Sequence, residues 1–112
     1  MTDQSLIAPQ AIFLDQQLMD RPDNTEMQLD LLLDYRNNIT LYPTFQAYFR
    51  QYKPPILAVW GDKDPYFSPA GAEAFKKDDP NTTVKFYDTG HFALETHYRE
   101  IGQDILEFMK TL

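Results

Sequence analysis

The sequence predicts an α/β fold, because two strand-like runs in its second half are separated by a helical stretch. Residues 56–60 form a short, continuous apolar run closed by Gly61, which is typical of a strand buried on both faces of a parallel sheet. Residues 83–87 alternate polar and apolar side chains and predict a second strand. A helix that connects two strands favours their parallel pairing.

The first half of the chain shows only helical patterns. Residues 6–19 predict a first helix, interrupted by Pro9. After a turn, a second helix capped by Asn24 or Thr25 is expected to run to about Asn37. It is dense in leucine and is therefore expected to be buried on more than one side. These leucines are Leu29, Leu31, Leu32 and Leu33.

A third helix is expected to begin near Pro43, because proline suits the first position of a helix. Four of its aromatic side chains recur at helical spacing and form one face. They are Phe45, Tyr48, Phe49 and Tyr52. Two interpretations of this face stay open, namely packing in a core and lining an apolar pocket. Both need a partner surface.

The second half begins with the two prolines at 54–55, which end the third helix. Beyond the first strand, Ser68 and Pro69 have the residue types of a helix start, and a short helix is expected over residues 70–77. A final amphipathic helix is expected over residues 98–112. Its apolar stripe consists of Ile101, Ile105, Phe108, Met109 and Leu112. Two strands do not make a stable sheet alone, so further strands are expected from the first half or from outside this chain.

The composition excludes several classes of function. The chain has 112 residues and a net charge of −7, so it is a poor partner for nucleic acid and for an anionic membrane surface. It has no cysteine, which excludes a disulfide framework and a cysteine nucleophile. No apolar run is long enough to span a bilayer, and the first residues do not resemble a secretory signal. A cytoplasmic location is therefore expected.

Two loops hold the residues best placed for chemistry. Asp62 and Asp64 follow the first strand, and His91 follows the second. Functional groups of open α/β sheets gather at the carboxyl ends of the strands. An aspartate and a histidine there can form a hydrogen-bonded pair, in which the acid orients the imidazole and the imidazole acts as a general base. Asp64 and His91 are the candidates for this pair.

Taken singly, these residues leave other interpretations open. Asp62 and Asp64 also suit a solvated turn, and His91 also suits a loop or a helix cap. His97 is expected to be exposed near a helix start. Asp62, Asp64 and Asp88 lack the spacing of metal ligands, so no metal is expected.

With these two loops, the chain resembles the carboxyl-terminal part of an α/β-hydrolase, in the epoxide hydrolase and haloalkane dehalogenase-like branch. The first matching stretch is residues 55–67, Pro-Ile-Leu-Ala-Val-Trp-Gly-Asp-Lys-Asp-Pro-Tyr-Phe. The second is residues 87–95, Tyr-Asp-Thr-Gly-His-Phe-Ala-Leu-Glu. The resemblance implies that Asp64 is the acid of a catalytic triad and that His91 is its base. It implies no organic cofactor, because the family's chemistry needs only water and side chains.

The resemblance also implies two segments. Residues 1–53 resemble the end of a helical cap and the helix that returns to the sheet. Residues 54–112 resemble the carboxyl-terminal segment with the acid and histidine loops. The family's nucleophile sits on a glycine-flanked strand-to-helix elbow, and neither Ser5 nor Ser68 has such flanks. The oxyanion-hole loop and the first strands are missing as well.

The first hypothesis is therefore a fragment of a hydrolase that is inactive alone. Completed by an amino-terminal hydrolase half, it is expected to hydrolyse a small apolar substrate, namely an epoxide, a haloalkane or an ester. The second hypothesis is a non-catalytic remnant or interaction module that folds by self-association, with the aromatic helix face covering an incomplete core. The expected partner is thus an amino-terminal half or a second copy of the chain.

Overall fold

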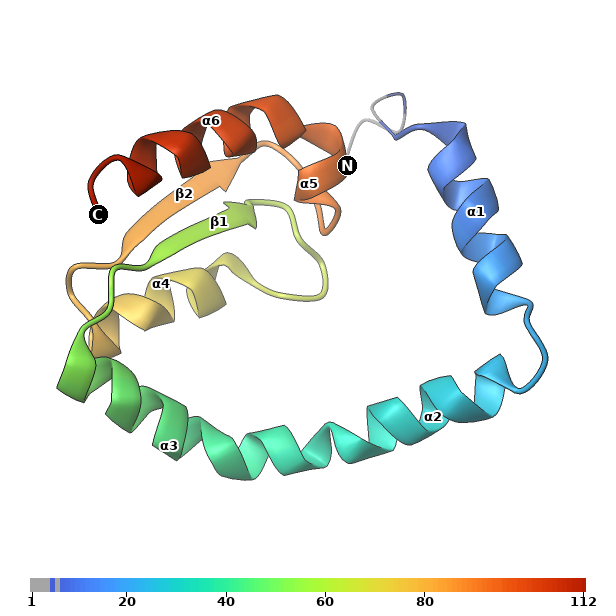
Figure 1. Ribbon diagram of the computed structural model, residues 1–112, viewed down its shortest axis with the longest axis horizontal. Helices are drawn as coiled ribbons and strands as arrows, with labels where there is room; N and C mark the ends of the chain where they lie inside the picture. The colour runs from blue at the N-terminus through green and yellow to red at the C-terminus, as the bar shows by residue number, and fades with distance from the viewer. Residues whose placement is uncertain (1–4, 6) are drawn as a thin grey trace.

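Six helices and two strands make up the described part of the chain (Figure 1). The structure is a computed structural model, and it describes residue 5 and residues 7–112. In chain order the elements are α1 (Pro9–Met19), α2 (Asn24–Asp34), α3 (Arg36–Tyr52), β1 (Leu57–Gly61), α4 (Pro69–Asp78), β2 (Thr83–Tyr87), α5 (Ala93–Thr96) and α6 (Tyr98–Met109).

Strands β1 and β2 form a two-stranded parallel sheet, which confirms the predicted pairing. The register places Gly61 opposite Tyr87, so both strands end at the same edge. Helix α4 connects them and begins at Pro69, as expected, although the Ser68 side chain makes no capping hydrogen bond. The described residues before β1 add no strand to the sheet.

The sheet lies between two helices (Figure 1). Helix α4 covers one face and α6 covers the other, and both contact β1. The buried apolar side chains come from these three elements. They are Ala58, Ala72 and Ile101. Lys85 and Tyr87 of β2 both bond to Asp104 of α6, which fastens the second strand to this helix.

Helix α3 joins the sheet region through its last turns. The Phe49 ring meets the Phe75 ring of α4 edge-on at 5.8 Å, and Arg50 pairs with Asp78 at the end of α4. The helix is capped by Lys53, whose φ of 45° lies in the left-handed region. The two prolines at 54–55 follow.

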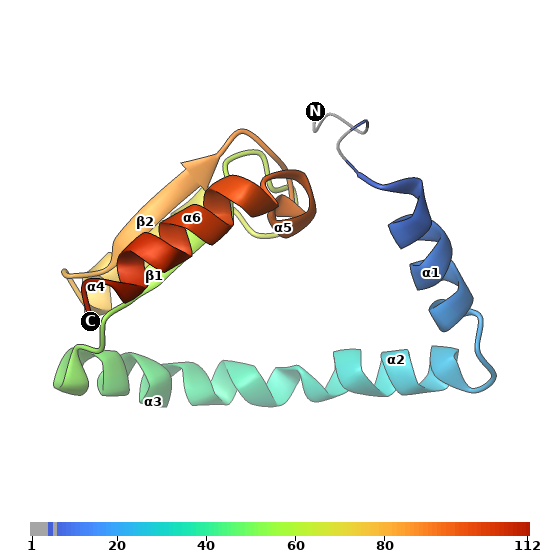
Figure 2. The same ribbon diagram turned by 45° about the horizontal axis from the view of Figure 1, so that its top comes forward.

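The three amino-terminal helices form an arm that extends away from the sheet (Figures 1 and 2). Helices α2 and α3 follow one another almost in line, and α1 turns back from the far end. The radius of gyration is 16.8 Å, whereas a compact domain of this length has about 13 Å. None of the helices found in the described residues is long and apolar enough to cross a membrane.

The expected helix boundaries in the arm are partly wrong. Pro9 begins α1 rather than interrupting a helix, because a proline at the first helical position loses no hydrogen bond; residue 6 of the expected helix lies outside the described residues. The third helix begins at Arg36, not at Pro43, which lies inside it. The backbone of Tyr35 is helical, so the helix is already formed in the turns that precede the proline. The Tyr35 hydroxyl also lies 2.6 Å from the Tyr42 hydroxyl, which links these turns.

The expected burial of the arm is wrong. The four leucines of α2 are 54–72% exposed, because no other element of the described chain covers them. On the aromatic face of α3, Phe45, Tyr48 and Tyr52 are also exposed, and Phe49 alone of the four packs on α4. Leucine density and helical spacing indicate a face that needs a partner, but they do not supply one.

Smaller differences concern the sheet region. Only Ala58 and Gly61 of β1 are buried and the other three residues are half-buried, so the two covering helices bury the strand less completely than expected. Helix α6 ends at Met109 instead of continuing to Leu112. The single turn of α5 is too short to produce a periodic pattern in the sequence.

The small core makes Ile101 the most important apolar side chain of α6. Ile101 is 1% exposed, so Ile101→Ala is expected to lower the free energy of unfolding by about 2–5 kcal/mol. Urea unfolding followed by the fluorescence of Trp60, the single tryptophan, measures this loss. Ile105→Ala is the matched control, because Ile105 is one turn away and 42% exposed. It is expected to cost about 0.5 kcal/mol, and equal losses would contradict the packing described above.

Candidate active site

Two loops meet at the carboxyl edge of the sheet. The backbone N–H groups of Asp62 and Lys63 donate to the carbonyls of Tyr87 and Thr89, each at 3.0 Å. The Lys63 ammonium also pairs with the Asp88 carboxylate. Both of these side chains are exposed, so the ion pair adds little stability and the backbone bonds carry the connection. The loop after β1 is thus fixed directly to the loop after β2.

Gly61 permits this contact because it has no side chain. A Cβ at this position would lie 2.2 Å from the Gly90 carbonyl oxygen and 2.6 Å from that of Thr89. No glycine in the described residues has a positive φ. The requirement at Gly61 is therefore one of space between two backbones, not of an unusual conformation.

Asp64 lies at the centre of the first loop and is bonded through both carboxylate oxygens. Its Oδ1 accepts the backbone N–H groups of Tyr66 and Phe67, at 2.8 and 3.0 Å. Its Oδ2 lies 2.9 Å from Nδ1 of His91, which is 27 residues away in the sequence. The side chain is only 6% exposed. Asp64 therefore forms a turn, as one interpretation of the sequence suggested, but it also meets His91.

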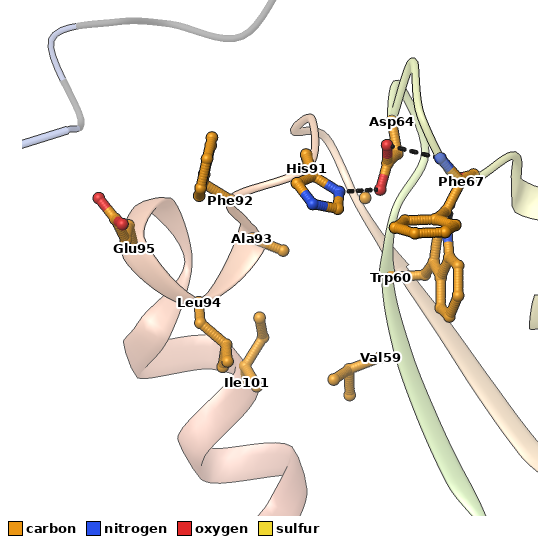
Figure 3. A pocket seen from close by; sticks show the side chains of 11 residues that line it. Val59, Trp60, Asp64, Phe67, His91, Phe92, Ala93, Leu94, Glu95 and Ile101 are labelled. Atoms are coloured by element: carbon orange, nitrogen blue, oxygen red, sulfur yellow. Dashed lines mark hydrogen bonds and ion pairs between the residues drawn. The ribbon is translucent and has the colours of Figure 1, made fainter. Parts of the chain in front are cut away.

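The environment keeps the Asp64 carboxylate ionised. Burial raises the pKa of Asp64, but the hydrogen bonds from Phe67, His91 and Tyr66 outweigh it, so the pKa lies below its ordinary value. The carboxylate then accepts a hydrogen bond from Nδ1–H of the imidazole. In the neutral ring this leaves the lone pair on Nε2. Nε2 lies on the side of the ring away from Asp64 (Figure 3).

Three aromatic rings surround His91. The centroids of Tyr66 and Phe67 lie 5.3 Å from the imidazole centroid, and that of Phe92 lies 5.4 Å from it. The backbone carbonyl of Phe67 accepts a hydrogen bond from Nε1 of Trp60 at 2.9 Å, which ties the first loop back to β1. The imidazole is 35% exposed, so it is held by its neighbours and remains accessible.

A cavity of about 430 Å³ opens beside the pair (Figure 3). Apart from Asp64, His91 and Glu95, its lining side chains are apolar. They come from β1, the two loops, α5 and α6 and include Val59, Trp60, Phe67, Phe92, Leu94 and Ile101. Such a site can bind a small apolar molecule next to one acid–histidine pair.

The other residues considered from sequence lie outside this pair. Asp62 is exposed, and Asp88 bonds to Lys63. His97 precedes the first residue of α6, as expected, but it is half-buried rather than exposed, because its ring lies beside that of Tyr87, with the centroids 5.9 Å apart. Its Nδ1 lies 2.9 Å from the Thr96 hydroxyl. Within the residues that the structure describes, no group of three or more acidic or histidine side chains is arranged to hold a metal ion.

Nothing in the sequence pattern singles out Thr89 or Thr96. Their hydroxyl oxygens lie 2.7 Å apart, and Thr89 is completely buried. The sequence shows only that a threonine lies on each side of the histidine loop. Since threonine is common in loops, the contact becomes visible only when the path of the chain is known.

A parallel β-α-β unit with an acid after one strand and a histidine after the next points to one class of protein. Residues 16–98 match the sequence profile of a family described as "alpha/beta hydrolase fold". The chain belongs to the α/β-hydrolase fold family, so the expected resemblance to this family is confirmed.

One relative of the chain is the uncharacterized hydrolase YNR064C of Saccharomyces cerevisiae. It is 51% identical over 100 residues, which are 89% of this chain. The match covers 34% of the yeast protein, so the chain spans about a third of the length of this relative.

The contact at Gly61 yields a test of the site geometry. Gly61→Ala is expected to separate the two loops and destabilise the fold by about 1–3 kcal/mol, because the new methyl group meets backbone atoms that cannot rotate away. Gly71→Ala is the control: nothing lies within 4 Å of its Cβ position, and alanine should stabilise α4 by about 0.5–1 kcal/mol. Urea unfolding measures both, and an unaffected Gly61→Ala chain would refute the close approach.

The lowered pKa of Asp64 yields a prediction of acid sensitivity. The stability that this carboxylate contributes is fully present above its ordinary pKa of 3.8 and is lost as the pH falls through the lower folded-state value. Asp64→Asn is expected to remove this part of the acid dependence and to lower stability at pH 7. Unfolding curves from pH 7 to pH 2 test it, with the exposed neighbour variant Asp62→Asn as control. Identical pH profiles for the two variants would contradict it.

Proposed function

We propose that this chain supplies the acid and the base of a hydrolase active site. Asp64 orients His91, and His91 activates water. The observation that carries the proposal is the 2.9 Å contact between Oδ2 of Asp64 and Nδ1 of His91 at the edge of an apolar cavity. Membership of the α/β-hydrolase fold family supports it.

The chemistry follows from which imidazole nitrogen is engaged. With Nδ1 bonded to Asp64, Nε2 accepts a proton from a water molecule. The water oxygen forms a bond to the carbonyl carbon of an ester intermediate on a nucleophile, and the ester C–O bond breaks to release product and nucleophile. The Asp64 carboxylate stabilises the imidazolium that forms. The proton then leaves His91 with the departing group or to solvent.

The nucleophile that this mechanism needs comes from outside this chain. Neither serine of the sequence has the flanking glycines of a nucleophile elbow. The yeast relative is about three times as long as the matched region. We therefore propose that the chain corresponds to the carboxyl-terminal third of such a hydrolase. Residues 54–112 then hold the acid and histidine loops, and residues 1–53 correspond to the end of a cap and the helix returning to the sheet.

The proposed substrate is a small apolar molecule of the epoxide, haloalkane or ester class. The lining of the cavity supports this choice, because Val59, Leu94 and Ile101 offer no hydrogen-bonding groups to a polar substrate. The nucleophile decides among the classes. A carboxylate can open an epoxide or displace a halide, whereas a serine hydroxyl attacks an ester.

Complementation tests the proposal. The chain is co-expressed with an amino-terminal fragment of the yeast relative that ends where its match to this chain begins. Either fragment alone is expected to show no turnover above buffer, and the purified complex is expected to hydrolyse styrene oxide, 1-bromobutane or p-nitrophenyl butyrate. His91→Gln is expected to lower the turnover of the complex by ~10³-fold or more. A complex that forms and hydrolyses none of the three would overturn the proposal.

The same variant identifies the nucleophile. If it is a carboxylate, the His91→Gln complex still forms the ester intermediate but cannot hydrolyse it, so mass spectrometry should show a covalent adduct on the amino-terminal fragment. If it is a serine, His91 is needed for its activation and no adduct should accumulate. Asp64→Asn is expected to reduce turnover, and the matched variant Asp62→Asn to leave it within about twofold.

A second candidate function, a non-catalytic self-associating module, is favoured by the exposed arm. The apolar side chains of α1, α2 and α3 form a surface that monomeric proteins usually bury. Light scattering of the chain alone distinguishes the two. A cooperatively melting dimer that fails to bind the amino-terminal fragment supports this function, and a monomer that binds the fragment supports the first.

A further inference from the structure

The two ends of the segment that carries His91 are joined by a contact between two threonine hydroxyl groups. Thr89 follows β2, and Thr96 ends α5, so His91 lies on the chain between them. Their Oγ1 atoms are 2.7 Å apart. The Thr89 residue is 0% exposed and Thr96 is half-buried, so solvent reaches this contact from the Thr96 side at most. We call it the threonine bridge.

The closure matters for His91 because the backbone hydrogen bonds around it lie at the neighbouring residues. The backbone hydrogen bonds in the segment join Glu95 and Thr96 to Phe92 and thus belong to the turn of α5. In the part of the chain that the structure describes, neither Gly90 nor His91 takes part in a backbone hydrogen bond outside regular helices and strands. Besides Asp64 and the neighbouring aromatic rings, the residues that fix both ends of the segment therefore determine the position of the imidazole.

Thr89 also connects the segment to the acid loop. Its carbonyl accepts the backbone N–H of Lys63 at 3.0 Å, and the same carbonyl faces the space left by Gly61. One residue thus contacts the Asp64 loop through its backbone and α5 through its side chain. A displacement of Thr89 would change the position of His91 relative to Asp64.

The other end of the bridge contacts His97, whose backbone carbonyl accepts the N–H of Ile101 in α6 at 3.0 Å. The Thr96 hydroxyl lies 2.9 Å from Nδ1 of His97, which precedes the first residue of that helix. Helix α6 in turn contributes the buried Ile101. A continuous set of contacts therefore leads from the acid loop through Thr89, Thr96 and His97 to the packed core.

We propose that Thr89 and Thr96 are positioning residues for His91, and that their bridge holds Nδ1 of His91 at hydrogen-bond distance from Asp64. The bridge does not touch substrate or the reacting atoms. The positioning itself is a property of this chain, and its consequence for turnover rests on the proposed function.

The test measures the imidazole directly. In the ¹⁵N-labelled full chain, NMR records the solvent exchange of the His91 Nδ1 proton and the tautomer of the ring. Thr89→Val and Thr96→Val keep the side-chain shape and remove one hydroxyl each. Each is expected to speed this exchange by roughly 5- to 10-fold, the effect of losing one buried hydrogen bond. Thr89→Ser keeps the hydroxyl and is expected to stay within twofold of the original chain.

Thr82→Val is the matched control. The Thr82 hydroxyl is also buried, and it has no hydrogen-bond partner among the described residues. Its removal should leave the exchange at His91 unchanged. The Thr89→Val/Thr96→Val double variant should exchange no faster than Thr96→Val alone, because the Thr89 hydroxyl acts only through the bridge. Unchanged exchange in both folded single variants would overturn the proposal, as would an equal effect of Thr82→Val.

Turnover of the complemented enzyme gives a separate result. Loss of the bridge is expected to lower kcat by ~10-fold, because a displaced base slows hydrolysis of the ester intermediate. If the complex is inactive with the original chain, the proposed function fails while the NMR result still decides the role of the bridge. If the complex is active and Thr89→Val changes neither kcat nor exchange, the positioning role fails alone.

Discussion

The contact between the two loops at the edge of the sheet is the constraint on which the site depends. Parallel pairing brings the ends of β1 and β2 to the same edge, but it does not by itself bring the following loops into contact. The missing side chain at Gly61 lets the Thr89–Gly90 backbone approach, and two backbone hydrogen bonds hold it there. Because the contact is made by backbone atoms, it defines the positions of Asp64 and His91 with little conformational freedom.

The pattern of packing divides the chain into two physically different parts. In the sheet region, helices cover both faces and the polar side chains of the site are bonded. Along the arm, apolar side chains are exposed and Asn24 is the only buried residue of the described helices α1 to α3. The stability of the folded chain therefore lies in the sheet region, and the arm is expected to open at a lower free energy than the sheet. The candidate site is built in the more stable part.

The sequence was sufficient where local pattern decides the structure. The apolar run before Gly61, the alternation up to Tyr87 and the order acid-then-histidine predict two parallel strands and a meeting of Asp64 with His91, and these are present. It was insufficient where the outcome depends on distant atoms. The leucines of α2 indicate a buried helix only if a covering surface exists. Proline at position 43 favours a helix start but is tolerated inside a helix whose neighbouring turns are already formed.

The junction between arm and sheet has a geometric consequence. Lys53 ends α3 in a left-handed conformation that costs a residue other than glycine about 1–2 kcal/mol, and two prolines with restricted φ angles follow it. The prolines allow few alternative φ angles, and the last turns of α3 also contact α4, so the joint is restricted and not freely flexible. The direction of the arm relative to the sheet is therefore restricted before any partner binds. A partner that fits both surfaces would meet them already aligned and would lose less entropy on binding than one that had to orient a loose arm.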